Sequence, residues 1–522
     1  MPLFLSIVSG VLAGLSFPRY GLPLLAWVAY VPLLCSIAKV TGRYTLLKSY
    51  AYGFVSGLVT NVILLYWIVV AMHRYGNIGV FASIAALLML STLLSMLYTG
   101  TFTLLVRLFR DSRLSGEILF VPVTWVLLEY ARTYLFSGFP WELLGYSQYR
   151  DLPLIQISRF TAVYGLSFLI MLFNTLLYEV IAWWYEVRSI RTARYPFLFA
   201  KTVAVLSLMT GIIVYGDVTM NRTNAALKAP GRDLRVALIQ GDVDQSQKWD
   251  PAFQETTMKD YLSLSLRAYE HSRPELIVWP ETATPFFFQS EPRYTDMISS
   301  FARAHDTHLL IGSPTYRYTD TGVKYFNSAL LISSDGRVQG VYDKRHLVPF
   351  GEYLPLKRIF SFMKKLTDSI GAFTPGSGPV MLRFDGIRIG TLICYEIIFP
   401  QLSADDARSG ANLLVTITDD AWFGDTSAPY QHLSMAVFRA VENDRFVVRA
   451  ANTGISAVIA PTGRILSATG LFVPAFIDAT VRPIDTKTFY TLHGDVFVLL
   501  CMAVFCVLVL SMAYKRISRR SL

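Results

Sequence analysis

The chain has 522 residues, of which 53% are hydrophobic and only 16% are charged, and its formal net charge is +10. An ordinary soluble domain carries about 25% charged residues. The excess positive charge lies in residues 1–216 and 496–522, whose balances are +8 and +4, whereas residues 217–495 balance to −2. This distribution excludes a basic nucleic-acid-binding domain, a disordered chain and a single soluble globule. It predicts a membrane protein with a near-neutral soluble domain inserted before the last span.

Long apolar runs predict membrane-spanning helices, because about 20 apolar residues are needed to cross the hydrocarbon core. We expect a bundle of about seven helices in residues 1–216, and a last helix with a basic tail in residues 496–522. The first span is short, but it lacks the basic start of a signal peptide and is kept as a span. The expected spans lie near residues 3–17, 22–38, 50–71, 78–106, 117–134, 162–185, 196–216 and 496–514.

Lys and Arg are concentrated in every second loop, a pattern that is typical of the cytoplasmic side of membrane proteins. One set of loops and the tail hold thirteen basic residues: Lys39, Arg43, Lys48, Arg107, Arg110, Arg113, Arg188, Arg191, Arg194, Lys515, Arg516, Arg519 and Arg520. The alternate loops hold five: Arg19, Arg74, Arg132, Arg150 and Arg159. We therefore expect both termini in the cytoplasm and the 217–495 domain across the membrane, which in a bacterium is the periplasmic side.

The chain has four cysteines, and three of them, Cys35, Cys501 and Cys506, lie in expected spans. Cys394 is the single cysteine of the soluble domain, so it has no disulfide partner there. A lone thiol in an oxidising compartment calls for a reason. No cluster of Cys and His has metal-ligand spacing, and we expect neither a metal nor another cofactor.

Residues 235 onward alternate short β-rich runs with helical stretches such as 251–271 and 429–444. This alternation predicts an α/β domain with a central sheet over residues 217–495. Polar residues follow three of the runs, and strand ends are where sites in α/β sheets are usually built. Glu281 follows ELIVWP, Lys344 follows GRVQGVYD, and Cys394 follows RIGTLI.

Together the three residues form a complete set for covalent acyl transfer. A free thiol has a pKa of about 8.5 and is mostly protonated at neutral pH, so it needs a base to become a nucleophile. The carboxylate of Glu281 can accept that proton, and the ammonium of Lys344 can stabilise an oxyanion. Taken singly, each residue has an ordinary alternative: a strand-end carboxylate, a solvated surface lysine or a core cysteine. Their joint occurrence at three strand ends favours the catalytic interpretation.

The segments around these residues resemble the nitrilase superfamily, and the whole chain resembles the apolipoprotein N-acyltransferase family of bacterial inner-membrane enzymes. The resemblance rests on VALIQGDVDQSQKWD (236–250), VWPET (278–282), YDKRHLVPFGEYLP (342–355), CYEIIFP (394–400), DAWFG (420–424), RAANTGISAVIAPTG (449–463), WVLLEYART (125–133) and SGFPWELLGYSQ (137–148). It implies an α-β-β-α sandwich with a Glu281–Lys344–Cys394 triad. Two positions depart from the family pattern, because Asp242 and Asp419 stand where Asn is expected.

The resemblance also implies a reaction in two steps. Cys394 would take an acyl chain from a membrane phospholipid as a thioester, and the α-amino group of a diacylglyceryl-Cys at the N-terminus of an apolipoprotein would then receive it. Glu281 would act as the base, and Lys344 with the backbone N–H of Tyr395 would hold the oxyanion. Glu352 is expected to position Lys344 or to act as a second carboxylate, and Glu396 to anchor the nucleophile loop. A monomer suffices, since both substrates reach it through the bilayer.

Both substrates carry acyl chains, so apolar residues near the site are candidates for a lipid path. Phe286 and Phe287 follow the proposed base, and segment 356–366 mixes Phe360 and Phe362 with basic residues, as interfacial segments do. An ordinary amphipathic surface helix is the alternative for that segment. Three tryptophans are further candidates, although plain aromatic packing explains each equally well: Trp141, Trp249 and Trp422.

Two rival functions use the same sequence features. A membrane-tethered nitrilase or amidase would use the same triad with water as the second nucleophile. A non-enzymatic membrane scaffold or transporter with an inactive domain would not need the triad.

Glu129 and Arg132, near the end of the fifth expected span, are either close to the active site or form a structural ion pair between helices.

Overall fold

The computed structural model describes residues 1–112, 116–187, 195–320, 322–353 and 373–518. Its contacts divide the chain into two compact units. The helical unit comprises Met1–His73, Ile78–Asn221 and His493–Leu522, and the catalytic unit comprises Arg74–Asn77 and Arg222–Leu492. The predicted domain boundaries at residues 217 and 496 remain a prediction. The expected interfacial segment 356–366, with Phe360 and Phe362, lies outside the described residues, as do Arg113, Arg188, Arg191, Arg194, Arg519 and Arg520.

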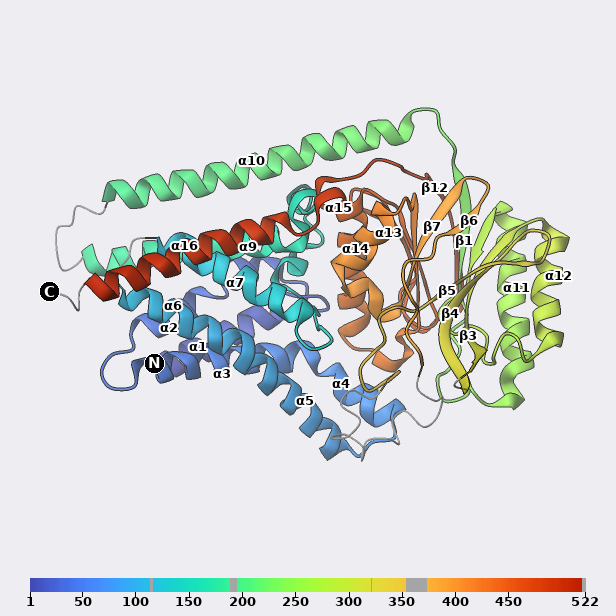
Figure 1. Cartoon of the computed structure of the whole chain (residues 1–522), viewed down its shortest axis with the longest axis horizontal. Helices are drawn as coiled ribbons and strands as arrows, with labels where there is room; N and C mark the ends of the chain where they lie inside the picture. Colours follow the sequence, from blue (N-terminus) through green and yellow to red (C-terminus); the bar gives the residue numbers. More distant parts are fainter. Residues whose placement is uncertain (113–115, 188–194, 321, 354–372, 519–522) are drawn as a thin grey trace. The chain divides into compact units, whose positions relative to one another are not determined.

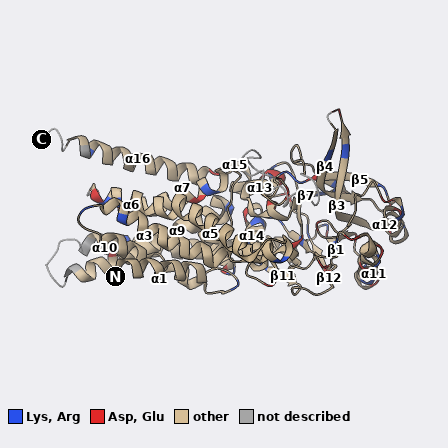
Figure 2. Ribbon diagram, turned by 90° about the horizontal axis from the view of Figure 1, so that it is seen from below, with Lys and Arg blue, Asp and Glu red and all other residues tan. Residues whose placement is uncertain are grey.

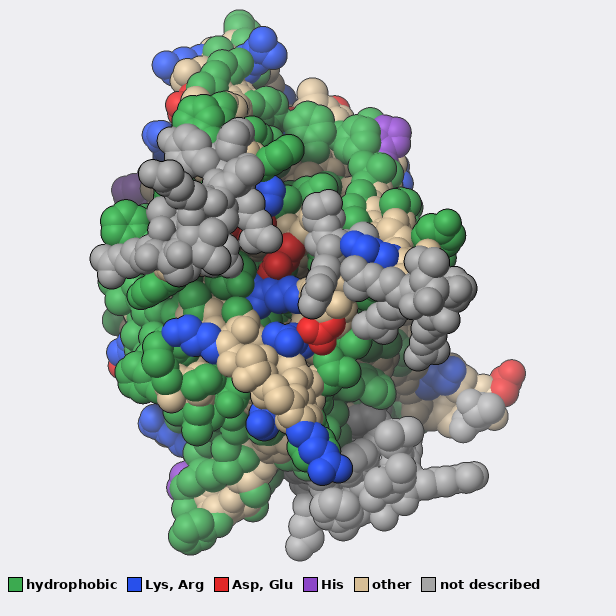
Figure 3. Space-filling view, turned by 90° about the vertical axis from the view of Figure 1, so that its left-hand side faces the viewer, with side chains coloured by type: hydrophobic (Ala, Val, Ile, Leu, Met, Phe, Trp, Pro, Cys, Tyr) green, Lys and Arg blue, Asp and Glu red, His purple; other side chains and the backbone are tan. Residues whose placement is uncertain are grey.

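The helical unit is built from apolar helices of very different lengths (Figure 1). Charged side chains are sparse along them and gather near their ends (Figure 2). Seen from the left-hand side of Figure 1, Lys and Arg side chains lie among apolar ones (Figure 3). The main helices are α1 (Pro2–Leu15), α2 (Val31–Ala38), α3 (Thr45–Leu65), α4 (Trp67–Val70), α5 (Val80–Leu94), α6 (Thr101–Asp111), α7 (Glu117–Tyr134), α8 (Leu152–Ile155), α9 (Ser158–Val187), α10 (Tyr195–Lys228) and α16 (Val496–Ser518).

Among the described residues, four helices are long and apolar enough to cross a membrane, or five if a bent pair counts as one span. The four are Val80–Asp111, Ser158–Tyr185, Phe197–Lys228 and Val496–Lys515, and the bent pair joins Thr45–Leu65 to Trp67–Tyr75. The predicted count of eight is therefore not confirmed. The expected span 22–38 shows why: it contains a 3₁₀ turn, Pro23–Trp27, followed by the eight-residue α2. At a rise of about 1.5 Å per residue, α2 alone is too short to cross.

Small residues let the helices of this unit approach closely. A Cβ atom built on Gly53 of α3 would lie 2.4 Å from the backbone oxygen of Thr99, and one on Gly57 would lie 2.7 Å from Thr99 Oγ1. Because contacts below about 3 Å are not tolerated, these positions require glycine, as is common where membrane helices cross.

The catalytic unit contains two six-stranded sheets with helices on their outer faces. The first sheet has the order β12-β1-β2-β3-β4-β5 and the second has the order β11-β10-β9-β8-β7-β6. Its strands are β1 (Leu234–Gln240), β2 (Leu276–Val278), β3 (His308–Thr319), β4 (Gly322–Ile332), β5 (Val338–Asp343), β6 (Leu382–Phe384), β7 (Ile387–Ile393), β8 (Leu413–Thr418), β9 (Val447–Ala451), β10 (Ala457–Ile459), β11 (Ile465–Ala468) and β12 (Ala475–Val481).

The alternation of side chains along the strands builds two separate cores. On β1, Val236 and Leu238 face the second sheet, where they join Ile389, Val415 and Val448 in one cluster. The intervening residues of the same strand pack against helices in a second cluster. Helices α11 (Gln254–Ser272) and α12 (Pro292–His305) cover the first sheet, and α13 (Pro400–Arg408) and α14 (Ala428–Asn443) cover the second (Figure 1). This arrangement is the expected α-β-β-α sandwich, and the predicted fold class is confirmed.

Candidate active site

Glu281 lies just beyond the carboxyl end of β2, with 6% of its surface exposed. Its Oε1 accepts hydrogen bonds from Asn327 Nδ2 at 2.7 Å and from Lys344 Nζ at 3.2 Å. Its Oε2 accepts from the backbone N–H of Asp419 at 3.0 Å. A buried carboxylate with both oxygens held in this way has a fixed orientation.

Lys344 follows β5. This strand runs in the same direction as β2, because β2 and β3 are parallel and β3, β4 and β5 are successively antiparallel. Its ammonium is 1% exposed and donates to Glu281 Oε1 and, at 2.9 Å, to Glu352 Oε1. Burial by itself lowers the pKa of Lys344, but the carboxylates of Glu281 and Glu352 raise it above its ordinary value. Lys344 is therefore a permanent cation between two carboxylates.

Cys394 comes directly after β7 and opens a 3₁₀ turn, Cys394–Ile398. Its backbone has a φ of +52°, a left-handed conformation that is uncommon for a residue with a side chain and often found at functional sites. Burial and the nearby Glu281 raise the pKa of the Cys394 thiol well above its ordinary value, whereas Lys344 and a hydrogen bond with Thr418 lower it. The resting nucleophile is thus a thiol beside an ordered carboxylate.

The two supporting glutamates hold backbone groups around this site. Glu352 accepts from the backbone N–H of Val348 at 2.8 Å through Oε2, while Asn327 and Lys344 donate to its Oε1. Glu396 is fully buried and accepts from the backbone N–H groups of Ile393, Arg345 and His346 and from the hydroxyl of Tyr342: the distances are 2.7, 2.6, 3.0 and 2.8 Å. Glu396 thereby ties the nucleophile turn to the chain that follows Lys344.

Three groups at this site were not predicted from the sequence. Asn327 on β4 bridges Glu281 and Glu352. Lys248, which is 2% exposed, donates to the carboxylate of Asp419 and, at 3.3 Å, to the carbonyl of Glu281. A cluster of Asp420, His432 and Arg449 lies behind Cys394. Lys248, Asp420 and Arg449 lie in segments that carry the family resemblance. An isolated polar residue in a strand or helix, however, does not indicate which residue it contacts.

The candidates for a lipid path are dispersed in the structure. Phe286 is 6% exposed and packs on Tyr294 in the core under α12, so it offers little surface to a lipid. Phe287 contacts the rings of Tyr316 and Tyr325. Trp422 is 39% exposed, Trp249 is half-buried, and Trp141 is buried in the helical unit against Trp67. Their role as a lipid path stays a prediction.

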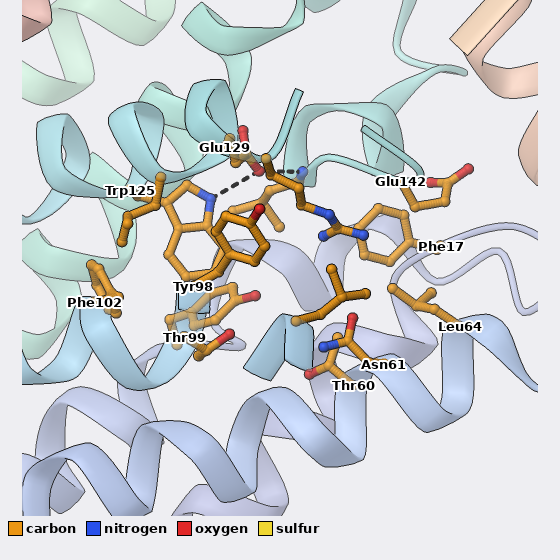
Figure 4. A pocket seen from close by; sticks show the side chains of 15 residues that line it. Phe17, Thr60, Asn61, Leu64, Tyr98, Thr99, Phe102, Trp125, Glu129 and Glu142 are labelled. Carbon is orange, nitrogen blue, oxygen red and sulfur yellow. Dashed lines mark hydrogen bonds between the residues drawn. The ribbon is translucent and has the colours of Figure 1, made fainter. Parts of the chain in front are cut away.

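A cavity of about 50 Å³ lies within the helical unit and includes Glu129, Arg132 and Glu142 in its lining (Figure 4). Glu129 accepts from Trp125 Nε1 at 2.9 Å and from the backbone N–H of Leu144 at 2.7 Å. Arg132 donates to the carbonyls of Phe139 and Trp141 at 2.9 and 2.8 Å. Both side chains therefore contact the segment after α7. Among the described residues, no group of three or more His, Cys, Asp and Glu side chains could hold a metal ion.

Comparison with known proteins identifies the chain. Two family models match it: the apolipoprotein N-acyltransferase N-terminal domain over residues 9–176 and carbon-nitrogen hydrolase over residues 235–488. An apolipoprotein N-acyltransferase from Geobacter metallireducens is 45% identical over 512 residues, covering 98% of this chain and 95% of the relative. The chain belongs to the apolipoprotein N-acyltransferase family. Another member, from Methylococcus capsulatus, is 33% identical and covers 94% of this chain and 92% of its own length.

Solved structures similar to this family member belong to the nitrilase superfamily. An amidase from Nesterenkonia is 22% identical, with a TM-score of 0.37, and the match covers 49% of this chain and 94% of the amidase. Nit3 from Saccharomyces cerevisiae is 21% identical, with a TM-score of 0.38, over 48% of this chain and 91% of its own.

Proposed function

We propose that the chain transfers an acyl group from a membrane phospholipid, through a thioester on Cys394, to the α-amino group of the N-terminal diacylglyceryl-Cys of lipoproteins. The observation that carries this proposal is the hydrogen-bonded pair of Glu281 and Lys344, whose interacting atoms are 3.2 Å apart. Both charges affect the pKa of the Cys394 thiol, which Glu281 raises and Lys344 lowers. Membership of the acyltransferase family supplies the reaction class, and this pair supplies the groups that the reaction needs.

In the first step, Cys394 Sγ attacks the carbonyl carbon of a phospholipid ester while its proton passes to the Glu281 carboxylate. The negative charge moves to the carbonyl oxygen of the ester, where the ammonium of Lys344 and the backbone N–H of Tyr395 stabilise it. Collapse of the tetrahedral intermediate breaks the ester C–O bond. The departing alkoxide takes the proton from Glu281 and leaves as a lysophospholipid, and the acyl group remains on sulfur.

In the second step, the amine of the diacylated apolipoprotein attacks the thioester. Glu281 accepts a proton from the amine, the same oxyanion is stabilised, and the C–S bond breaks to give an amide. The sulfur recovers its proton from Glu281. Two substrates that alternate on one covalent intermediate predict ping-pong kinetics. Glu352 and Asn327 act through Lys344 and Glu281, whose positions they hold.

We further propose a bacterial inner-membrane location with both termini in the cytoplasm, the catalytic unit in the periplasm and a monomeric enzyme. The alternation of basic loops supports this orientation, and lateral access of both lipid substrates supports a monomer. A hydrolase acting on a small amide or nitrile is not favoured, because the relatives that align over nearly the whole chain are named acyltransferases.

The test uses full-length protein in vesicles with a radiolabelled phospholipid and a synthetic diacylated lipopeptide. Wild type is expected to form a labelled, hydroxylamine-sensitive acyl-enzyme that the lipopeptide discharges, and Cys394→Ala is expected to form none. Cys506→Ala is the matched control, because Cys506 is an exposed thiol on α16. Labelling that survives in Cys394→Ala, or acyl groups released only to water, would contradict the proposal.

A further inference from the structure

Three buried polar residues connect the catalytic unit's second sheet to the carbonyl of the nucleophile. Asp420 begins the 3₁₀ turn Asp420–Phe423, His432 lies on α14 and Arg449 lies on β9. Their exposed fractions are 1%, 0% and 0%. Taking such groups out of water is costly unless their partners are well placed.

The contacts run in one direction, from Arg449 to Cys394. Arg449 Nη2 donates to Asp420 Oδ2 at 2.6 Å, and Thr418 Oγ1 donates to Asp420 Oδ1 at 2.9 Å. His432 Nδ1 lies 3.0 Å from Asp420 Oδ1 and 3.2 Å from Arg449 Nη2. His432 Nε2 lies 3.1 Å from the backbone oxygen of Cys394. Because a carbonyl oxygen only accepts, Nε2 carries a proton and donates it. Burial and Arg449 lower the pKa of His432, so its ring is neutral and Nδ1 accepts from Arg449 Nη2, while Asp420 holds that guanidinium in place.

The acceptor of this bond is not an ordinary carbonyl. The peptide group between Cys394 and Tyr395 contains both the oxygen held by His432 and the Tyr395 N–H. Cys394 has a φ of +52°, so its backbone needs surrounding contacts to keep this conformation. A hydrogen bond to the carbonyl fixes the plane of the peptide. It also polarises the peptide, and hydrogen bonds in such chains strengthen one another.

We propose that Arg449, Asp420 and His432 form a positioning relay that orients and polarises the Cys394–Tyr395 peptide, so that its N–H binds the oxyanion of acyl transfer. The inference rests on the proposed function, since it concerns the oxyanion of that reaction. None of the three residues touches the reacting atoms. Their effect passes through the backbone of the nucleophile, and it concerns the developing oxyanion rather than the thiolate.

Two amide substitutions of the same chemistry separate this role from a structural one. In His432→Gln the amide nitrogen can lie near the position of Nε2 and still donate to Cys394. In His432→Asn the shorter amide reaches only the position of Nδ1, so the contact with Cys394 is lost while a polar group remains beside Asp420. His308→Leu, a histidine that stacks on Phe384 elsewhere in the same unit, is the control for general destabilisation.

Two reactions of Cys394 are measured on each variant. Single-turnover acyl-enzyme formation from phospholipid passes through an oxyanion, whereas alkylation by iodoacetamide does not. Peptide mapping restricts the alkylation signal to Cys394. Removing a direct oxyanion donor costs about 10²–10³-fold in rate, so loss of its polarisation is expected to cost roughly tenfold.

The proposal predicts that His432→Asn slows acylation about tenfold while alkylation stays within about twofold of wild type, and that His432→Gln restores most of the acylation rate. Asp420→Asn, which keeps His432 in place, should show a smaller loss of the same kind. Equal losses in both reactions, or unchanged acylation in His432→Asn, would overturn the relay. Both outcomes leave the proposed function intact, because that function fails on other results: labelling that survives in Cys394→Ala, or acyl groups that wild type releases only to water.

Discussion

Asp419 is one of two positions where the chain departs from the Asn expected in its family, and the structure predicts that restoring Asn is harmful here. Asp419 is 4% exposed, and both of its carboxylate oxygens accept hydrogen bonds. Oδ1 accepts from the backbone N–H of Ala421 and from Asn452 Nδ2, each at 3.2 Å, and Oδ2 accepts from the ammonium of Lys248. An Asn side chain has one acceptor oxygen, so its NH₂ group must face a donor whichever way it turns.

The cost follows from the burial of Lys248. Removing one partner of a buried ion pair typically costs about 3–5 kcal/mol. In Asp419→Asn part of this loss is offset, because Asn still accepts from Ala421 and Lys248 keeps the Glu281 carbonyl at 3.3 Å. We expect the free energy of unfolding to fall by about 2–4 kcal/mol. For a unit of this size, that corresponds to a decrease of roughly 5–15 °C in melting temperature.

The assay is thermal unfolding of full-length protein in detergent, followed by tryptophan fluorescence, with Asp242→Asn as the matched control. Asp242 is half-buried with a φ of +54°, which Asn tolerates, and burial and Asp244 raise its pKa. Its substitution should therefore leave the melting temperature unchanged or slightly raise it. In the double variant Lys248→Met/Asp419→Asn, the two losses should be less than additive. The pairing argument is refuted if Asp419→Asn has the melting temperature of wild type, or if the stability losses of the two single variants simply add in the double variant.

Two further outcomes follow from the structure and a third from the sequence. In Glu352→Gln a single oxygen remains to accept the hydrogen bonds of Val348, Asn327 and Lys344. We therefore expect kcat to fall roughly ten- to a hundredfold with little change in KM. The control, Glu270→Gln on the exposed face of α11, should have no effect. Burial raises the pKa of Asp420, but Arg449 and His432 outweigh it and lower this pKa from 3.8 to about 2. The ionised form of Asp420 therefore stabilises the fold above about pH 4 by about 2 kcal/mol. This contribution is lost as the pH falls towards 2. Asp420→Asn should thus flatten the acid dependence of urea unfolding between about pH 4 and 2, and an unchanged slope would contradict the assigned shift. Replacing Phe360 and Phe362 with Ser should lower activity on bilayer phospholipid more than on a short soluble ester, and an equal loss on both would refute the interfacial role.

The catalytic unit could be predicted well because its pattern is local. Apolar runs of strand length end directly at Glu281, Lys344 and Cys394, and strand ends are where sites in α/β domains are usually built. The first two follow strands of the first sheet and Cys394 follows a strand of the second. The contacts that hold these side chains are not local. Asn327 lies 46 residues from Glu281, and Lys248 lies 171 residues from Asp419. No periodicity or spacing in the sequence connects such positions.

The helical unit was harder to predict, because the hydropathy of a segment reflects its composition and does not show whether the segment forms one continuous helix. The expected span 22–38 is apolar throughout, yet Pro23 begins a 3₁₀ turn and Pro32 lies in the first turn of a separate short helix. Proline is accepted at these positions because the first N–H groups of a helix have no internal partner. In α7, a largely apolar helix, Glu129 accepts from the backbone N–H of Leu144 and Arg132 donates to the backbone carbonyl of Phe139, both of which lie after the helix. Both features depend on tertiary partners.

The buried charges around the thiol favour Glu281, rather than solvent, as the acceptor of its proton. Hydrogen bonds connect three carboxylates and two ammonium groups at this site: Glu281, Glu352, Asp419, Lys344 and Lys248. With Cys394 protonated, their formal sum is −1, and a thiolate whose proton had left for solvent would make it −2 in a poorly solvated site. Proton transfer to Glu281 during attack avoids this increase, because Glu281 becomes neutral as the negative charge passes through sulfur to the oxyanion beside Lys344. The sum stays at −1 throughout. A thiol pKa raised well above its ordinary value is therefore compatible with an effective nucleophile, since the thiolate need not exist before the substrate is bound.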